Sequence, residues 1–140
     1  MIILDTNVIS ELMREKPDPN VKQWVDQQKA IHLSLTTITI AEIQRGLMRL
    51  PPGKRRTNLE TNFNRFVNAA FAGRVYSFNQ EAAYLYGQIA AQREHCGFHA
   101  DAVDLMVAAI AKSEDAKIAT RNIKGFSGCS IDLINPWESD

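Results

Sequence analysis

The sequence predicts an α/β domain in which a parallel sheet is covered by helices on both faces. Short runs with the two-residue period of strands alternate with longer segments whose apolar residues recur at helical spacing. Strands that are separated by helices pair in parallel, and such sheets are buried on both faces. The length of 140 residues suits one domain. Since no repeat, low-complexity tract or linker composition interrupts it, we expect a single domain over residues 1–140.

The first half of the chain is expected to supply two strands and four helices. Strand-type alternation places strands at residues 1–4 and 31–35, and apolar residues at three- and four-residue spacing predict helices at 7–13, 20–29, 40–50 and about 59–71. Phe63, Phe66 and Phe71 form an aromatic stripe on the fourth helix. We expect this stripe in the core or on a dimer surface, and a groove for a partner helix is the alternative.

The second half is expected to supply three strands and two helices. Strands are predicted at 75–78, 117–120 and 130–134, and helices at 80–96 and 102–113. Asn79 is placed to cap the first of these helices, and Gly97 to end it. Pro136 is expected to stop the last strand.

Composition excludes some classes of function. Sixteen Lys and Arg balance sixteen Asp and Glu, which argues against a broad basic face for nucleic acid, although the consecutive Lys54, Arg55 and Arg56 leave room for a local contact. The longest apolar run, residues 105–111, is too short to span a membrane. Two cysteines are too few for a disulfide framework, so a reduced, cytoplasmic setting is expected.

Three acidic residues lie where the sheet and its helices are expected to meet. Asp5 follows the first strand, Glu42 lies just after the second, and Asp104 is in the first turn of a helix. Each also has a structural interpretation. Asp5 suits a helix N-cap, Glu42 is the last residue of a capping box that begins at Thr39, and Asp104 suits the helix dipole, with Asp101 as the cap.

Together the three acids indicate a metal site, because ligands of parallel sheets bind beyond the carboxyl ends of the strands. Each pair of carboxylates at 4 Å repels by about 1 kcal/mol in water and by about 4 kcal/mol at an effective dielectric near 20, so the cluster needs a cation or a proton. Oxygen ligands without His or Cys suit Mg²⁺ or Mn²⁺ rather than zinc. Such sites typically perform phosphoryl chemistry.

Four segments match, in order, the motifs of one known family. They are residues 2–11, residues 39–43 with Gly46, residues 104–111, and residues 119–122, and the ending Asn135-Pro136-Trp137 is typical of the same branch. The sequence therefore resembles the PIN-domain ribonucleases, in particular the VapC-type and FitB-like toxins of bacterial type II toxin–antitoxin pairs.

This resemblance implies a three-layer α/β/α fold with a mostly parallel sheet of four or five strands. It also implies a metal-dependent endoribonuclease, a hydrolase whose Mg²⁺ (or Mn²⁺) would be bound by Asp5, Glu42 and Asp104. Thr6 would hydrogen-bond and orient Asp5. The supporting residues of the fourth motif would be Thr120, Asn122 and Arg121, with Arg121 and the basic residues near Lys54 contacting RNA phosphates.

The implied partners are an RNA substrate and a VapB/FitA-like antitoxin whose tail covers the acidic site. DNA would be bound only through the antitoxin, the chain would form a homodimer, and no membrane is involved.

The fourth motif departs from the family pattern. Asn122 stands where many relatives carry Asp, and Gly125 stands where relatives with the Asn often carry an acid, so the site holds three formal negative charges instead of four. The alternative function is therefore a catalytically weak or silent PIN-fold module that acts in complex with a DNA-binding antitoxin. A receiver domain or a haloacid-type phosphatase is disfavoured, because neither Asn7 nor the end of the third expected strand supplies the acid those folds need.

Overall fold

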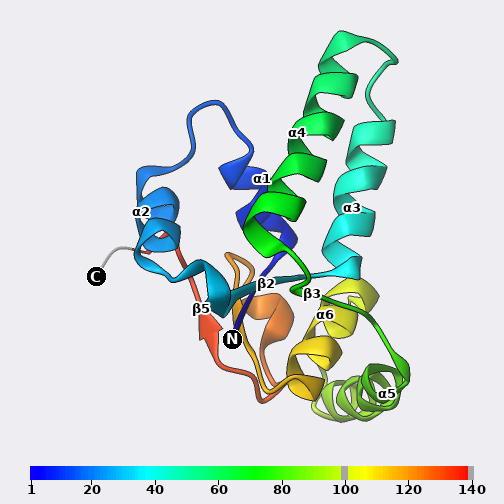
Figure 1. Cartoon of the computed structure of the whole chain (residues 1–140). Coiled ribbons are helices and arrows are strands. Elements are labelled where there is room, and N and C mark those ends of the chain that lie inside the picture. Colours follow the sequence, from blue (N-terminus) through cyan, green and yellow to red (C-terminus); the bar gives the residue numbers. More distant parts are fainter. Residues whose placement is uncertain (99–100, 139–140) are drawn as a thin grey trace.

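The computed structural model describes residues 1–98 and 101–138, in which a five-stranded sheet lies between two layers of helices (Figure 1). All neighbouring strands are parallel, in the order β3-β2-β1-β4-β5. The strands are β1 (Ile2–Leu4), β2 (Leu33–Thr36), β3 (Val75–Tyr76), β4 (Lys117–Ala119) and β5 (Leu133–Ile134). The predicted fold class, a helix-covered parallel sheet, is confirmed.

Six α-helices within the described residues cover the two faces of the sheet. They are α1 (Thr6–Leu12), α2 (Pro19–Gln27), α3 (Thr37–Met48), α4 (Lys54–Phe71), α5 (Gln80–His95) and α6 (Ala102–Ser113). Figure 1 shows α3 and α4 side by side as a hairpin that projects from the body of the molecule, whereas α5 and α6 pack together elsewhere. No helix in the described part of the chain is long and apolar enough to cross a membrane.

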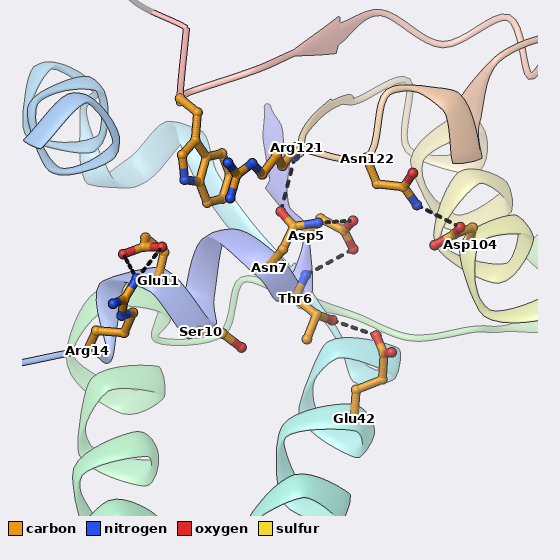
Figure 2. Close-up of a pocket in the computed structure, with 11 residues that line it drawn as sticks. Asp5, Thr6, Asn7, Ser10, Glu11, Arg14, Glu42, Asp104, Arg121 and Asn122 are labelled. Atoms are coloured by element: carbon orange, nitrogen blue, oxygen red, sulfur yellow. Dashed lines mark hydrogen bonds and ion pairs between the residues drawn. The ribbon is translucent and has the colours of Figure 1, made fainter. Parts of the chain in front are cut away.

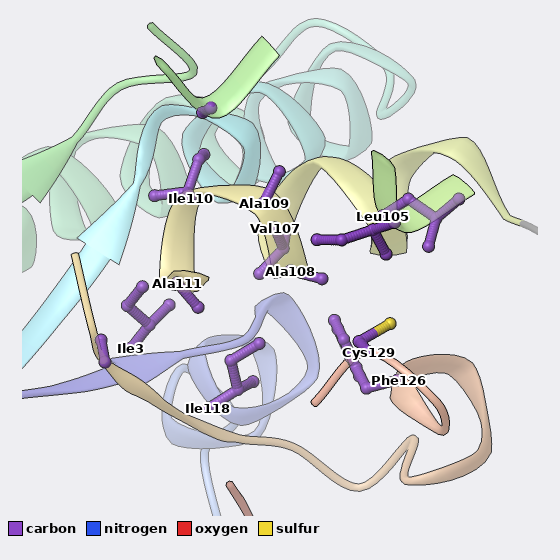
Figure 3. Close-up of a cluster of buried hydrophobic side chains, with 13 residues drawn as sticks. Ile3, Leu105, Val107, Ala108, Ala109, Ile110, Ala111, Ile118, Phe126 and Cys129 are labelled. Carbon is purple, nitrogen blue, oxygen red and sulfur yellow. The ribbon is translucent and has the colours of Figure 1, made fainter. Parts of the chain in front are cut away.

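The central strand β1 divides the core into two clusters, because successive side chains of a strand point to opposite faces. Ile3 packs with Ile118 against α5 and α6 (Figure 3). Leu4 packs on the other face with residues of α1, α2, α3 and α4. Helix α6 is apolar almost all round, and its residues 107–111 are fully or nearly buried. This burial fixes the helix against the sheet and thereby fixes the position of its first turn.

Phe63 and Phe71 are buried in the second cluster, which confirms their expected place in the core. Phe66 is partly buried and meets Phe71 edge to face, with ring centroids 5.4 Å apart. Asn79 caps α5 by accepting a hydrogen bond from the Ala82 amide at 3.0 Å, as the sequence predicts.

Two helices begin at least three residues earlier than the sequence predicts. Helix α3 begins at Thr37 instead of residue 40, because the Thr36 hydroxyl caps it by accepting from the Thr39 amide at 3.2 Å. Helix α4 begins at Lys54 instead of near residue 59. Its first turn is polar and exposed, so apolar spacing gives no sign of it.

Three strands depart from the predicted bounds by two residues or more. Strand β3 ends at Tyr76 instead of residue 78, because its partner β2 ends at Thr36. Ile31 belongs to a short 3-10 helix, Ala30–His32, and is 65% exposed, so the apparent alternation before Leu33 is not part of β2. Strand β5 begins at Leu133, three residues later than expected, because Ser130 has a left-handed φ of 58° that interrupts extended backbone.

Candidate functional site

The carboxyl ends of the central strands open into a pocket of about 570 Å³ (Figure 2). All three acids singled out from the sequence line it, so the structure brings Asp5, Glu42 and Asp104 to one site. The complete lining consists of Asp5, Thr6, Asn7, Ser10, Glu11, Arg14, Glu42, Asp104, Arg121, Asn122 and Trp137. Among the predicted supporting residues, Thr120 lies just behind this wall and is fully buried.

Asp5 directly follows β1 and is only 5% exposed. Its backbone amide donates to the carbonyl of Ala119 at 3.0 Å, which ties it to the neighbouring strand β4. Its Oδ1 caps α1 by accepting from the Thr6 amide at 2.9 Å. Its Oδ2 accepts from the Thr120 hydroxyl at 2.9 Å and from the side-chain amide of Asn7 at 3.3 Å. Asp5 is therefore both a helix cap and a pocket residue. All the groups that donate hydrogen bonds to its carboxylate are neutral.

Asp104 lies in the first turn of α6, half-buried. The helix is capped by Asp101, whose Oδ1 accepts from the amides of Val103 at 2.9 Å and Asp104 at 3.2 Å. The expected capping role of Asp101 is confirmed. The carboxylate of Asp104 accepts from Nδ2 of Asn122 at 3.0 Å.

Asn122 uses its amide group and its backbone to connect the two carboxylates. While Nδ2 donates to Asp104, its Oδ1 accepts from the Gly125 amide at 3.2 Å. Its backbone N–H donates to the Thr120 hydroxyl at 3.0 Å, and that hydroxyl donates in turn to Asp5. The fourth motif thus forms a continuous chain of hydrogen bonds from Asp5 to Asp104.

Glu42 is exposed and lies in the second turn of α3. The capping-box interpretation is wrong, because α3 begins at Thr37 and its cap is Thr36. The Oε1 atom of Glu42 instead accepts from the Thr6 hydroxyl at 2.6 Å. Thr6 forms the expected hydrogen bond to Asp5 through its backbone amide, whereas its side-chain hydroxyl holds Glu42.

The three carboxylates share the pocket without forming a closed cluster. Within residues 1–98 and 101–138, no group of three or more His, Cys, Asp or Glu side chains is placed closely enough to hold a metal ion. Figure 2 shows the reason: the carboxylate of Glu42 is turned to Thr6, and that of Asp104 to Asn122.

The electrostatics of the pocket show that the acids nevertheless act on one another. Burial raises the pKa of Asp5, and repulsion by Glu42 adds to this, against hydrogen bonds from Thr120, Thr6 and Asn7. Burial raises the pKa of Asp104 to about 6, with further contributions from the charges of Asp101, Asp5 and Glu42. In the described part of the chain neither Asp5 nor Asp104 forms an ion pair. A proton or a cation would therefore relieve the repulsion among these carboxylates.

Five lining residues were not predicted from the sequence: Asn7, Ser10, Glu11, Arg14 and Trp137. The first three follow Asp5 on α1, so helical spacing from Asp5 was the available signal for them. The sequence around Arg14 carries no signal of the pocket, and Trp137 belongs only to the ending that is typical of the family branch.

Arg121 lines the pocket as expected, and its guanidinium lies over the Trp137 ring, 5.2 Å from the ring centre. Lys54, by contrast, begins α4 and is not part of the pocket lining. Figure 1 places the start of α4 at the tip of the α3–α4 hairpin, so the expected phosphate contact by Lys54 at this site is not supported.

The fold and the pocket define a known class of protein. Residues 2–127 match the family model of the PIN domain, and the chain belongs to this family. Individual relatives are similar to it over almost the whole chain. It is 41% identical to "VapC ribonuclease Y4jK" of Sinorhizobium fredii over 138 residues, which are 99% of each chain. It is 35% identical to "Toxin FitB" of Neisseria gonorrhoeae over 137 residues, 98% of this chain and 99% of that protein.

Solved structures agree with this assignment. The structure of FitAcB from Neisseria gonorrhoeae contains a chain that is 34% identical and superposes with a TM-score of 0.93, covering 99% of this chain and 100% of that one. A second structure, of FitAB bound to a DNA fragment, gives a TM-score of 0.94 at 34% identity, covering 100% of this chain and 98% of that one.

Proposed function

We propose that this chain is the toxin of a bacterial type II toxin–antitoxin pair and acts as a Mg²⁺-dependent endoribonuclease. The observation that carries the proposal is the convergence of Asp5, Glu42 and Asp104 on one pocket at the carboxyl ends of parallel strands, in a member of the PIN-domain family. Full-length similarity to a VapC ribonuclease and to the toxin FitB supports the same conclusion.

The pocket fits a hard divalent cation. PIN-domain nucleases generally depend on divalent metal ions. No histidine or cysteine is among the described residues that line the pocket, and carboxylate and amide oxygens are the donors that Mg²⁺ prefers, with Mn²⁺ as a substitute. Asp5 and Asp104 would hold the ion directly, and Glu42, held by Thr6, partly through water. When bound, the ion would activate water and neutralise charge on the attacked phosphate.

The other residues of the site position these ligands. Thr120 holds the carboxylate of Asp5, and Asn122 holds that of Asp104, so the two side chains keep one orientation before any ion arrives. Arg121 would bind a phosphate of the RNA that flanks the scissile bond.

The proposed partners follow from the relatives. The structure of FitAcB from Neisseria gonorrhoeae and that of FitAB bound to a DNA fragment each hold a relative of this chain together with FitA. We therefore expect a FitA- or VapB-like antitoxin that covers the acidic pocket, contact with DNA only through that antitoxin, a homodimer, and a cytoplasmic location.

One observation favours the second candidate, a silent binding module. Asn122 supplies an amide where an acid would add charge, and the carboxylates of the described residues do not form a three-ligand cluster. Tight binding of the antitoxin together with an absence of RNA cleavage in Mg²⁺ or Mn²⁺ would establish this alternative.

The deciding experiment measures cleavage of single-stranded RNA by the purified chain in Mg²⁺. Asp5→Asn and Asp104→Asn should each reduce cleavage by at least about a hundredfold, since each removes a charged ligand. Asp101→Asn is the matched control: Asn also caps helices well, so this variant should keep its activity. Circular dichroism checks that all three variants are folded. Retained cleavage in both Asp5→Asn and Asp104→Asn would contradict the proposed site.

A further inference from the structure

The half of the pocket that lies away from Asp104 has a chemistry of its own. Figure 2 shows Asp5 between Asp104 on one side and the pair of Glu11 and Arg14 on the other. Ser10, Arg121 and Trp137 also line the pocket, and the Arg121 guanidinium lies over the Trp137 ring. Beside the three acids the lining therefore offers two guanidinium groups and an indole ring, and the further carboxylate, Glu11, is already paired with Arg14.

Arg14 is anchored at the pocket wall by a buried carboxylate. Glu11 is 8% exposed, and both of its oxygens accept from Nη1 of Arg14, at 3.2 and 3.3 Å. Glu11 also accepts from the backbone amide of Asp18 at 3.0 Å, which fixes its position after α1. The side chain of Arg14 remains 67% exposed, and its Nε and Nη2 make no hydrogen bond to any described residue. These donors are available to a ligand.

Arg121 is held by contacts that leave its charge uncompensated. Its backbone amide donates to the side-chain oxygen of Asn7 at 3.2 Å, and its guanidinium lies over the ring of Trp137. Trp137 is fixed through its own backbone, since its carbonyl accepts from Asn20 at 2.9 Å and its amide donates to Asn135 at 3.0 Å. The guanidinium of Arg121 forms no ion pair within residues 1–98 and 101–138.

We propose that this half of the pocket is a subsite for one nucleotide of single-stranded RNA, next to the phosphate that is cleaved. Arg14 and Arg121 bind phosphate oxygens, and the stack of Arg121 on Trp137 receives the base. The inference rests on the proposed ribonuclease function and extends it from the reacting phosphate to the neighbouring nucleotide.

The chemistry of the lining supports this choice of ligand. Guanidinium groups bind phosphates through paired hydrogen bonds, and unstacked bases pack on aromatic rings and on guanidinium planes. Both arginines are already oriented by Glu11 and Trp137, so little side-chain freedom is lost on binding. The pocket of about 570 Å³ is far larger than a hydrated ion requires and falls in the range, roughly 300–1,000 Å³, of small-molecule sites.

Trp137 itself can report the binding. The chain has two tryptophans, Trp24 and Trp137, so Trp24→Phe leaves a single indole, and Asp104→Asn keeps the RNA intact. Hexauridylate and hexaadenylate are titrated into this double variant in Mg²⁺. We expect a saturable change in Trp137 fluorescence, because a base stacked on the Arg121–Trp137 pair alters the surroundings of the indole.

The fluorescence anisotropy of a labelled hexanucleotide, titrated with the Asp104→Asn chain, measures the affinity without relying on Trp24→Phe.

Three variants locate the contact. Arg14→Gln and Arg121→Gln should each weaken hexanucleotide binding about tenfold and lower the slope of log K against log salt by about one. Lys54→Gln is the matched control: it removes the same charge at the start of α4, outside the pocket, and should leave binding unchanged.

Unchanged Trp137 fluorescence, together with affinities insensitive to Arg14→Gln and Arg121→Gln, would overturn the subsite. Binding of hexaglutamate but not of RNA would overturn it as well, since the half-pocket would then serve an acidic protein segment. Failure of the ribonuclease function is a separate result. If the unaltered chain does not cleave RNA but hexanucleotides still bind in an Arg14- and Arg121-dependent way, the subsite stands and the catalytic proposal falls.

Discussion

Each of the three acids proposed as metal ligands is held by a neutral donor. Thr120 donates to Asp5, Thr6 to Glu42, and Asn122 to Asp104. Neutral donors fix the direction of a carboxylate without neutralising it, so the negative charge of the pocket remains available to a cation. Burial and the repulsion between the acids raise the pKa values of Asp5 and Asp104, and the hydrogen bonds from these donors offset the rise only in part.

The pKa of Asp104, raised to about 6 mainly by burial, predicts the pH dependence of metal binding. A proton competes with the ion for this carboxylate, so affinity for Mn²⁺ should be constant above about pH 7. It should fall by up to about tenfold per pH unit below pH 6. Isothermal titration calorimetry between pH 5 and 8 measures the affinity for Mn²⁺. An affinity that does not change over this range would show that Asp104 is not a ligand.

The stability of the metal-free chain should depend on pH in the opposite way. Because the pKa of Asp104 in the folded chain lies above its ordinary value of 3.8, the folded state takes up the proton more readily than the unfolded state. The contribution of Asp104 to stability is therefore fully present below about pH 4 and is lost as pH rises through 6. The raised pKa of Asp5 acts in the same direction.

Asp104→Asn removes this penalty, so in EDTA at pH 7 the variant should be more stable than the parent chain. At pH 4 the difference between the two should disappear. Urea denaturation at the two pH values tests both statements. A variant that is less stable than the parent at pH 7 would refute the assigned electrostatics.

Gly125 allows Asn122 and Asp104 to meet. A Cβ atom at residue 125 would lie 2.5 Å from Oδ2 of Asp104 and would also overlap Nδ2 of Asn122. Gly125→Ala should therefore displace this hydrogen bond, with a loss of about 1–3 kcal/mol in stability and weaker Mn²⁺ binding. Gly87→Ala, in the interior of α5 with no atom near its Cβ position, should instead stabilise the chain by about 0.5–1 kcal/mol. Equal effects of the two substitutions on Mn²⁺ affinity would contradict this role of Gly125.

At the scale of the elements, the caps of α3 and α5 should contribute equally to stability but differ in their effect on metal binding. The two helices cover opposite faces of the sheet. Thr36→Val removes the cap of α3, and Asn79→Ala removes the cap of α5. Each should lower the free energy of unfolding by about 1 kcal/mol. Only Thr36→Val should also weaken Mn²⁺ binding, because α3 carries Glu42. Calorimetry of both variants, with and without Mn²⁺, makes the comparison, and equal loss of affinity in both would be the contrary result.

The elements that sequence patterns predict best are those whose burial is strongest. Helix α6 is found at residues 102–113 as expected, because its apolar run and the Asp101 cap agree. Helix α4 begins before its apolar spacing does, since its polar first turn follows Gly53 without a side-chain cap. The 3-10 turn before Leu33 has the alternating pattern of a strand in its sequence. That pattern is local, and it carries no information on whether Ile31 pairs with a neighbouring strand.

At the scale of the molecule, topology explains why distant acids meet. Strand β1 lies between β2 and β4, so Asp5, which follows β1, and Glu42, in the helix that follows β2, share one edge of the sheet with the first turn of α6, the helix that leads into β4. This much of the site was predictable from the sequence. The individual contacts were not, because they depend on side-chain directions that only packing fixes: Thr6 reaches Glu42 across α1 and α3, and Trp137 reaches Arg121 from the end of the chain.

We propose that this edge of the sheet binds a divalent cation through Asp5 and Asp104, and a crystal soaked in Mn²⁺ decides whether it does. We predict anomalous scattering from an ion inside the pocket, with a carboxylate oxygen of each of these residues about 2.0–2.3 Å away. Ordered Mn²⁺ elsewhere on the chain, with the pocket empty at saturating concentration, would contradict this claim.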